Sequence, residues 1–291
     1  MTTMNRWIVG ARPRTLPAAV VPVALGAAAA AGEVGAVWWR AALALVVSLA
    51  LQVGVNYAND YSDGVRGTDA IRVGPVRLVG SGLASAGAVK KAAFAAFGVA
   101  AVAGLVLALE TTWWLLVVGA AAILAGWFYT GGPKPYGYLG LGELFVFVFF
   151  GLVATAGTAY VVCERITAVA WLAGCMAGCL ACALLVINNL RDIPTDVDAG
   201  KRTMAVRLGD AKTRTFYLAL LAIAFVLVVV IAAVDRPLAC IGVLGIVVAV
   251  PAAKAIRNGA KGRELIPILG ITGKVQLVTG LLAALGMVLS A

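Results

Sequence analysis

The 291-residue chain contains no histidine, and only 12% of its residues are charged, against about 25% in soluble domains. The missing imidazole excludes Ser-His-Asp and Cys-His catalysis, histidine-ligated zinc and a histidine general base. The five cysteines form no Cys-x2-Cys pair, and we expect them to pack as small apolar side chains. With 63% hydrophobic residues and a mean hydropathy of +1.01, the low charge excludes a soluble enzyme with a polar surface.

Long apolar runs recur along the whole chain. A bilayer-spanning helix needs about 20 mostly apolar residues. Nine segments are candidates: 16–32, 38–57, 88–109, 113–130, 140–162, 168–190, 213–234, 237–256 and 267–290. We therefore predict an all-α polytopic membrane protein, a bundle of nine transmembrane helices. Residues 4–10 are expected to form a short helix at the membrane interface.

Lysine and arginine are unevenly distributed between the connections. With the N-terminus inside, 19 of the 23 basic residues fall in inner segments and three in outer ones. This excess follows the positive-inside rule, so we predict a cytoplasmic N-terminus in a multi-pass protein of the bacterial inner membrane. The same bias explains the net charge of +10, and we expect no nucleic-acid partner.

Two polar patches interrupt the apolar pattern, each at the inner end of a predicted span. Both read Asn-x3-Asp followed by further aspartates, and they comprise Asn56, Asp60, Asp63 and Asp69, and Asn188, Asp192 and Asp196. Clustered carboxylates at a membrane boundary repel one another and lose solvation, so positive charge should lie among them. Carboxylate and amide oxygens suit Mg²⁺, which commonly bridges to substrate phosphates. The patches therefore indicate a Mg²⁺ site rather than solvated loops.

The two patches predict different local structures. In the first, side chains spaced by four and then three residues would share one face of a helix. The second contains Pro194, which disfavours helix at Ile193 and beyond. We therefore expect Asp192 to end its helix and Asp196 to lie on a turn.

Basic side chains occur in the same inner layer as the acids. They are Arg72, Arg77, Lys134, Lys201 and Arg202. Topology alone explains most of them, but such side chains also bind phosphate oxygens, with Mg²⁺ neutralising the remaining charge. Acids, bases and asparagines together indicate a site for a metal and a diphosphate.

A short inner loop rich in glycine and proline runs from Tyr129 to Glu143, and its composition predicts turns. Glu143 begins a span, where a carboxylate is unusual. Four aromatic residues follow, namely Phe145, Phe147, Phe149 and Phe150. We expect these to pack or to face lipid; the alternative is that they line a lipid chain or shield a carbocation.

At these residues the chain resembles the UbiA-type superfamily of intramembrane aromatic prenyltransferases, in length, span number and motif order. A closer resemblance is to the members that prenylate 1,4-dihydroxy-2-naphthoate in menaquinone biosynthesis. The segments that carry it are Arg12 to Pro17, Asn59 to Gly64, Gly74 to Arg77, Tyr129 to Glu143, and Asn189 to Asp196. The resemblance implies one transmembrane prenyltransferase domain over residues 1–291, with a lateral opening for lipid.

The resemblance also implies the chemistry. Mg²⁺ would bind the diphosphate of a polyprenyl diphosphate, and the naphthoate ring would attack the resulting allylic cation, losing CO₂ and giving demethylmenaquinone. The implied metal ligands are Asn56, Asp60, Asp63, Asn188, Asp192 and Asp196, with Tyr129 and Lys134 as further catalytic residues. The implied substrate contacts are Arg77, Lys134, Lys201, Tyr136, Asn59 and Arg14. With no histidine, any base would be a carboxylate, a tyrosine, water or diphosphate.

Two alternatives remain open at this point. One is a prenyltransferase for another aromatic acid, such as 4-hydroxybenzoate. The other is a secondary transporter, since two similar halves with intramembrane acids also describe transporters. Transporter sites lie near the bilayer midplane, whereas these acids lie at the inner edge, which favours the enzyme. The spacing leaves open whether Asp63 or Asp69 reaches the metal, and the sequence indicates neither the prenyl chain length nor the oligomeric state.

Overall fold

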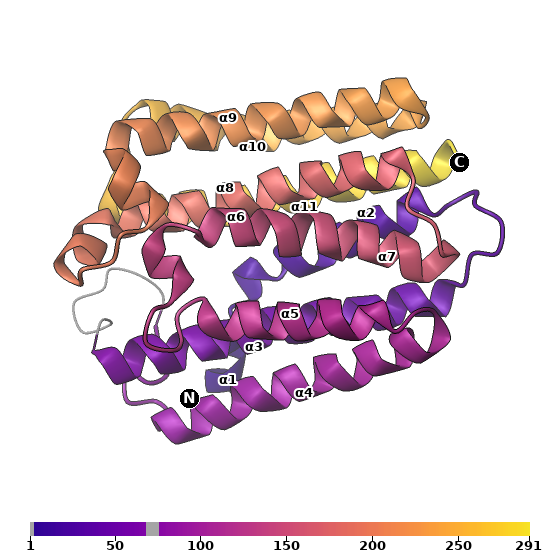
Figure 1. The fold of residues 1–291 in the computed structure, drawn as a ribbon. Helices are drawn as coiled ribbons and strands as arrows, with labels where there is room; N and C mark the ends of the chain where they lie inside the picture. The colour runs from indigo at the N-terminus through magenta and orange to yellow at the C-terminus, as the bar shows by residue number, and fades with distance from the viewer. Residues whose placement is uncertain (1–2, 68–75) are drawn as a thin grey trace.

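A computed structural model of the chain describes residues 3–67 and 76–291, and this part of the chain is helical, without a strand (Figure 1). Asp69, Arg72 and Gly74, which the sequence singled out, lie outside the described residues. The α-helices are α1 (Thr3–Ala11), α2 (Pro17–Ala29), α3 (Trp38–Arg66), α4 (Ala86–Glu110), α5 (Trp114–Phe128), α6 (Gly142–Val146), α7 (Ala154–Cys163), α8 (Ala168–Asp198), α9 (Met204–Val234), α10 (Gly245–Arg257) and α11 (Leu265–Leu289). The helix expected over residues 4–10 is present as α1.

Short helices of other types connect these elements. The 3₁₀ helices are η1 (Pro13–Thr15), η2 (Tyr136–Leu139), η4 (Pro237–Leu244) and η5 (Gly262–Glu264). A π-helix, η3 (Phe147–Val153), joins α6 to α7, so the predicted span over 140–162 is one continuous helical segment. In α9, Gly209 has φ 75° and interrupts the helix near its start, a left-handed conformation that glycine adopts without steric cost.

The described residues contain seven helical segments long and apolar enough to cross a membrane, not the nine predicted. The other two predicted spans form the shorter apolar helices α2 and α5, of 13 and 15 residues. A 13-residue helix is about 20 Å long, less than the roughly 30 Å of a bilayer core. The predicted class, a polytopic membrane helix bundle, is confirmed, and the count of full-length spans is corrected.

The long helices lie side by side in three layers (Figure 1). Helices α9 and α10 form one outer layer, α3, α4 and α5 form the other, and the remaining long helices lie between them. The middle layer holds the largest apolar core, centred on α8, which is 78% buried over its apolar window, against 33–39% for most of the other spans. Helix α8 is therefore the central helix of the fold.

Helices α3 and α8 both continue beyond their apolar parts, to Arg66 and Asp198, and both end at the same end of the bundle (Figure 1). The described residues of both polar patches are consequently helical, and the expectation that helix α8 ends at Asp192 is wrong. Pro194 lies inside α8. An interior proline costs about 3 kcal/mol, and the extensive burial of α8 outweighs that local cost.

Candidate active site

A cavity of about 540 Å³ lies between the α3–α5 layer and the segment from α6 to α8. At one end its wall is polar, and the lining residues there include Asn56, Asn59, Asp63, Arg77, Asn188, Asn189, Asp192, Asp196 and Lys201. Farther along, the lining residues are apolar and include Ala44, Val47, Leu105, Leu107, Leu115 and Val161. The cavity therefore suits an elongated molecule with a charged head and an apolar tail.

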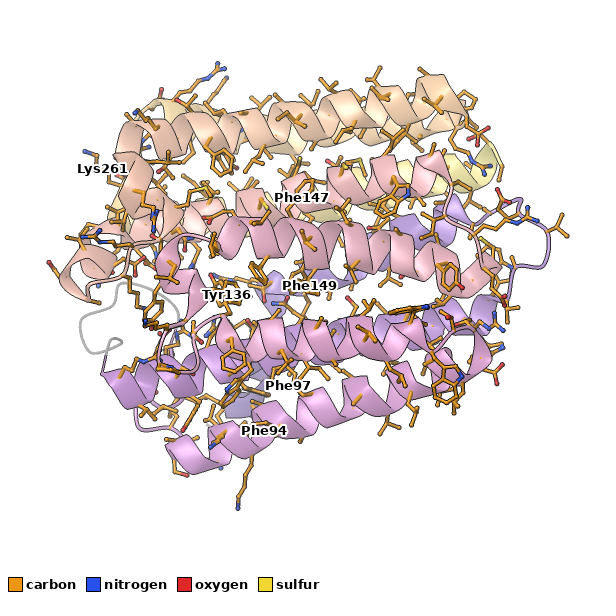
Figure 2. The ribbon with its side chains drawn as sticks, viewed as in Figure 1. Phe94, Phe97, Tyr136, Phe147, Phe149 and Lys261 are labelled. Atoms are coloured by element: carbon orange, nitrogen blue, oxygen red, sulfur yellow. The ribbon has the colours of Figure 1, made fainter. Side chains whose placement is uncertain are left out.

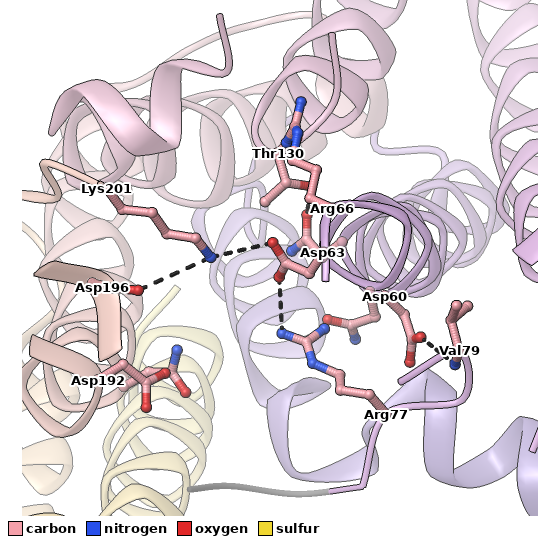
Figure 3. A network of polar contacts seen from close by, with 12 residues as sticks. Asp60, Asp63, Arg66, Arg77, Val79, Thr130, Asp192, Asp196 and Lys201 are labelled. Atoms are coloured by element: carbon pink, nitrogen blue, oxygen red, sulfur yellow. Dashed lines mark hydrogen bonds and ion pairs between the residues drawn. The ribbon is translucent and has the colours of Figure 1, made fainter. Parts of the chain in front are cut away.

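Asp63 is the centre of a polar network at the charged end (Figure 3). Its Oδ2 accepts a hydrogen bond from Nη2 of Arg77 at 3.3 Å, and its Oδ1 accepts from Nζ of Lys201 at 3.2 Å and from the Tyr138 hydroxyl at 2.7 Å. The same Nζ lies 4.0 Å from Oδ1 of Asp196. Lys201 thus connects the two aspartate patches, which lie 133 positions apart between Asp63 and Asp196.

Asp192 is held by the residue before it. The Arg191 guanidinium donates to both carboxylate oxygens of Asp192, at 2.7 Å each, and its Nη2 also donates to Oδ1 of Asn188 at 2.9 Å. All three side chains lie toward the C-terminal end of α8, and Arg191 is buried. Arg191 lies within the second motif but is not among the residues that the sequence pattern singled out. This arginine fixes the orientation of the Asn188–Asp192 pair toward the cavity.

Asp60 is bound by backbone groups in this structure. Its two carboxylate oxygens accept hydrogen bonds from the backbone N–H groups of Leu78 and Val79, at 2.8 and 3.0 Å (Figure 3). Asp60 is fully buried but is not among the residues that line the cavity. The side chain shares a helix face with Asp63, yet it anchors the chain segment next to Arg77.

Two further candidate residues lie away from the cavity. Arg14, in η1, and Lys134, in the loop after α5, are both exposed and are not among its lining residues. The neighbouring Arg12 lines the cavity instead, with φ 53°, in the left-handed region that few non-glycine residues adopt. Tyr129, Tyr136 and Asn59 line the cavity as well.

An aromatic wall forms one side of the cavity (Figure 2). The Tyr136 and Phe145 rings stack with centroids 4.0 Å apart, the Phe145 and Phe149 rings stack at 6.1 Å, and Tyr129 packs edge-on against Tyr136 at 5.5 Å. Phe150 also lines the cavity. The expectation that these phenylalanines only pack or face lipid is wrong for Phe145, Phe149 and Phe150, which line the cavity.

Phe147 is the exception among the four phenylalanines, since it is not among the lining residues. Its ring lies against α8, where a Cβ added to Gly178 would lie 2.7 Å from Cδ2 of Phe147. A Cβ on Gly151 would likewise lie 2.6 Å from Cα of Gly178. The glycines allow η3 and α8 to pack closely, as in other membrane helix pairs.

The loop between α5 and α6 places three tyrosines beside the acids. Burial raises the pKa of Tyr129 well above its usual value, and the Glu143 carboxylate raises it further. Burial also raises the pKa of Tyr136, and burial together with Asp63 raises that of Tyr138. A raised pKa makes each of these phenols harder to deprotonate.

Lys201 also has a shifted pKa. Burial lowers the pKa of its ammonium group, but the Asp63 and Asp196 carboxylates outweigh burial, and the net pKa is raised. The ammonium group also lies 4.5 Å from the Tyr138 ring centroid, a cation–π contact. Lys201 therefore carries a firm positive charge at the polar end of the cavity.

The donor chemistry of the polar end fits Mg²⁺. Among the described residues, no three acidic, cysteine or histidine side chains are grouped closely enough to hold a metal by themselves. Mg²⁺, however, usually retains waters and binds one or two carboxylates plus substrate phosphates. Asp63, Asp192 and Asp196 supply such carboxylates, and Asn188 supplies an amide oxygen in the same wall.

Known proteins resemble this chain in sequence and in fold. A 1,4-dihydroxy-2-naphthoate octaprenyltransferase of Mycobacterium tuberculosis is 54% identical over 284 residues, covering 98% of this chain and 97% of the relative. One of the same name from Mycobacterium leprae is 50% identical over 98% of this chain and 96% of the relative.

Among solved structures, a UbiA homolog from Archaeoglobus fulgidus bound to GPP and Mg²⁺ superposes with a TM-score of 0.70. It is 15% identical, and the superposition covers 97% of this chain and 99% of that one. The profile of the UbiA prenyltransferase family matches residues 19–264. The chain is a member of the UbiA prenyltransferase family.

Proposed function

We propose that the chain transfers a polyprenyl group from polyprenyl diphosphate to 1,4-dihydroxy-2-naphthoate, releasing diphosphate and CO₂, as a step of menaquinone biosynthesis. The names of the two mycobacterial relatives support this acceptor. The observation that carries the proposal is the cavity, which joins a charged end with both aspartate patches to an apolar body.

The charged end holds the diphosphate in this proposal. Arg77 and Lys201, both within hydrogen-bond reach of Asp63, turn to the diphosphate oxygens when the substrate enters. Asp63, Asp192, Asp196 and Asn188 would hold Mg²⁺, which would neutralise diphosphate charge and so favour departure of the diphosphate. The role of Asp60 as a metal ligand stays a prediction, because both of its oxygens accept backbone hydrogen bonds.

The aromatic wall and the apolar lining then serve the bond exchange. The allylic C–O bond breaks, with its electron pair leaving on diphosphate, and the wall excludes water that would capture the allylic cation. The electron-rich naphthoate ring forms the new C–C bond, and the carboxyl group leaves as CO₂. No oxidant takes part, so the direct product is the quinol form of demethylmenaquinone. Loss of CO₂ makes a strong protein base unnecessary.

The orientation in the membrane is also a proposal. The distribution of basic residues favours a cytoplasmic N-terminus in the cell membrane, and the ends of α3 and α8 that carry the aspartates would then face the cytoplasm. Lys201 and Arg77 lie at this same end (Figure 3). Charged substrate heads would enter from the cytoplasmic leaflet, with residues 1–291 acting as one catalytic domain.

The test is an acceptor comparison with the purified chain in nanodiscs. Polyprenyl diphosphate and Mg²⁺ are supplied with either 1,4-dihydroxy-2-naphthoate or 4-hydroxybenzoate, and prenylated products are identified by mass spectrometry. We expect a decarboxylated prenyl product from the naphthoate only. A product from 4-hydroxybenzoate alone would overturn the proposed acceptor. The absence of diphosphate release with both acids would overturn the proposal that the chain is an aromatic prenyltransferase.

A further inference from the structure

Glu143 is a carboxylate inside a membrane-spanning segment, and the reaction proposed above gives it no role. It is 4% exposed, in the first turn of α6. Among the described residues no lysine or arginine lies within 4 Å of it. Its Oε1 accepts a hydrogen bond of 2.9 Å from Nδ2 of Asn189 on α8. A buried carboxylate within a membrane is costly, so it is a candidate for function.

The Glu143 contact fixes the amide of Asn189. The NH₂ group of Asn189 faces Glu143 in the structure, because its Nδ2 is the atom that donates to Oε1. Asn189 is itself among the cavity-lining residues. No described residue donates a hydrogen bond to its Oδ1. The amide oxygen is consequently presented as an acceptor at the cavity wall.

The opposite wall contains an asparagine oriented the other way. The Thr130 hydroxyl donates to Oδ1 of Asn59 at 2.7 Å, which leaves the Asn59 NH₂ group as the free end of that amide. Asn59 also lines the cavity. Because each amide is held by a different kind of partner, the two walls differ: α3 offers a donor and α8 offers an acceptor.

A cavity-facing amide oxygen binds either a cation or a hydroxyl group. The Arg191 guanidinium donates to both Asn188 and Asp192. The asparagine that belongs to the carboxylate group on α8 is therefore Asn188, and not Asn189. Phe145 lies on the same short helix as Glu143 and stacks on Tyr136 and Phe149. An aromatic wall beside one oriented acceptor suits a hydroxylated aromatic ring.

We propose that Oδ1 of Asn189, oriented by Glu143, accepts the hydrogen bond of a ring hydroxyl on the aromatic acceptor. The inference rests on the proposed function and assigns the acceptor ring to the part of the cavity next to α6. Asn189 is the residue that touches substrate, and Glu143 is a positioning residue. A buried acceptor that loses its hydroxyl donor stays unsatisfied, so the site discriminates against rings without that hydroxyl.

The test compares Asn189→Leu with the unmodified chain in nanodiscs, using steady-state kinetics and competitive binding. We expect KM for 1,4-dihydroxy-2-naphthoate to rise by about 10- to 100-fold, with KM for polyprenyl diphosphate and the Mg²⁺ requirement within about twofold of the unmodified values. Unchanged acceptor KM, or a shift in the diphosphate or Mg²⁺ parameters instead, would overturn the inference.

Which ring hydroxyl Asn189 contacts is tested with two acids that each lack one hydroxyl, 1-hydroxy-2-naphthoate and 4-hydroxy-2-naphthoate. Both are used as competitive inhibitors. The unmodified chain should bind one of them at least about tenfold more weakly than the dihydroxy acid, and in Asn189→Leu that difference should disappear. If the difference persists in the variant, Asn189 does not contact the hydroxyl.

The positioning role has its own pair of variants. Glu143→Gln keeps an oxygen that accepts from Asn189 and should retain near-normal KM for the acceptor, whereas Glu143→Leu should raise it as Asn189→Leu does. Equal behaviour of the two variants would overturn the positioning role. If the unmodified chain does not prenylate the naphthoate at all, the proposed function fails; normal turnover with insensitive variants removes only this inference.

Discussion

Asp63 of α3 and Lys201, which follows α8, form an ion pair of 3.2 Å across the charged end of the cavity. The pair joins the two halves of the sequence at the site where the diphosphate is proposed to bind. Lys201 is mostly buried there, with its side chain 13% exposed. Lys201 therefore lies between Asp63 and Asp196, and in the proposed reaction it would offer its positive charge to the incoming diphosphate.

Lys201→Met should reduce turnover, because it removes that charge while keeping most of the apolar stem. A hydrogen bond to a charged group contributes roughly 1.5–3 kcal/mol, so kcat/KM for polyprenyl diphosphate should fall by at least about tenfold. Lys212→Met, at an exposed position on α9, is the matched control and should leave kcat/KM unchanged. Equal kinetics for both variants would contradict the assignment of Lys201 to the diphosphate site.

Asp192→Asn should raise the Mg²⁺ concentration needed for half-maximal activity. The substitution keeps the size of the side chain but removes the negative charge that the metal and Arg191 share, so metal affinity falls. We expect an increase of about tenfold or more, a typical cost of disturbing a metal-site residue, measured by Mg²⁺ titration of turnover. Asp198→Asn, exposed near the end of the same helix, should titrate like the unmodified chain. An unshifted titration for Asp192→Asn would contradict the metal assignment.

Asp60→Asn separates anchoring from metal binding. The asparagine retains one acceptor oxygen for the backbone N–H groups of Leu78 and Val79, and one of them loses its partner. A buried unsatisfied group costs about 1–3 kcal/mol, so the thermal midpoint in detergent should fall. The Mg²⁺ titration should stay close to normal. A large rise in the Mg²⁺ requirement with an unchanged midpoint would instead make Asp60 a metal ligand.

Phe149→Leu and Phe147→Leu should differ, although the two residues lie two positions apart. Phe149 lines the cavity and stacks on Phe145, so its loss should lower kcat by about three- to tenfold through weaker shielding of the cation. Phe147 packs against Gly178, and its loss should mainly lower the thermal midpoint. The reverse pattern would contradict the orientation of the π-helix.

Gly151→Ala should destabilise the packing of η3 against α8. The added Cβ would lie 2.6 Å from Cα of Gly178 and 2.7 Å from the carbonyl oxygen of Gly174, and neither backbone atom can move aside cheaply. Such overpacking costs typically about 1–3 kcal/mol, visible as a lower thermal midpoint. Gly98→Ala on α4 has open space and should be neutral or slightly stabilising. Similar midpoints for the two variants would contradict the close contact.

The sequence predicted the parts of the fold that depend on composition. Apolar runs identified the helical segments, and the repeated Asn-x3-Asp pattern identified the two helices whose ends meet at the cavity. Asp63 and Asp196 were selected on that basis, and Lys201 links them. These features depend on residue type and spacing alone, which a single sequence contains.

Tertiary contacts determine the side-chain orientations and the helix end that the sequence alone did not predict. Asp60 and Asp63 share a helix face, but only the backbone of Leu78 and Val79 decides that Asp60 turns away from the cavity. Pro194 disfavours helix locally, and the burial of α8 overrides it. The segment after Glu143 contains the π-helix η3, and no 3.6-residue periodicity predicts a π-turn.

The most direct test of the central claim is a structure of the chain with Mg²⁺ and a polyprenyl S-thiodiphosphate, a substrate analogue that ionises slowly. We predict diphosphate density between Asp63 and the Asp192–Asp196 pair, with Lys201 on its oxygens and the prenyl chain in the apolar part of the cavity. Diphosphate bound elsewhere on the chain, with Lys201 still paired to Asp63, would contradict the account.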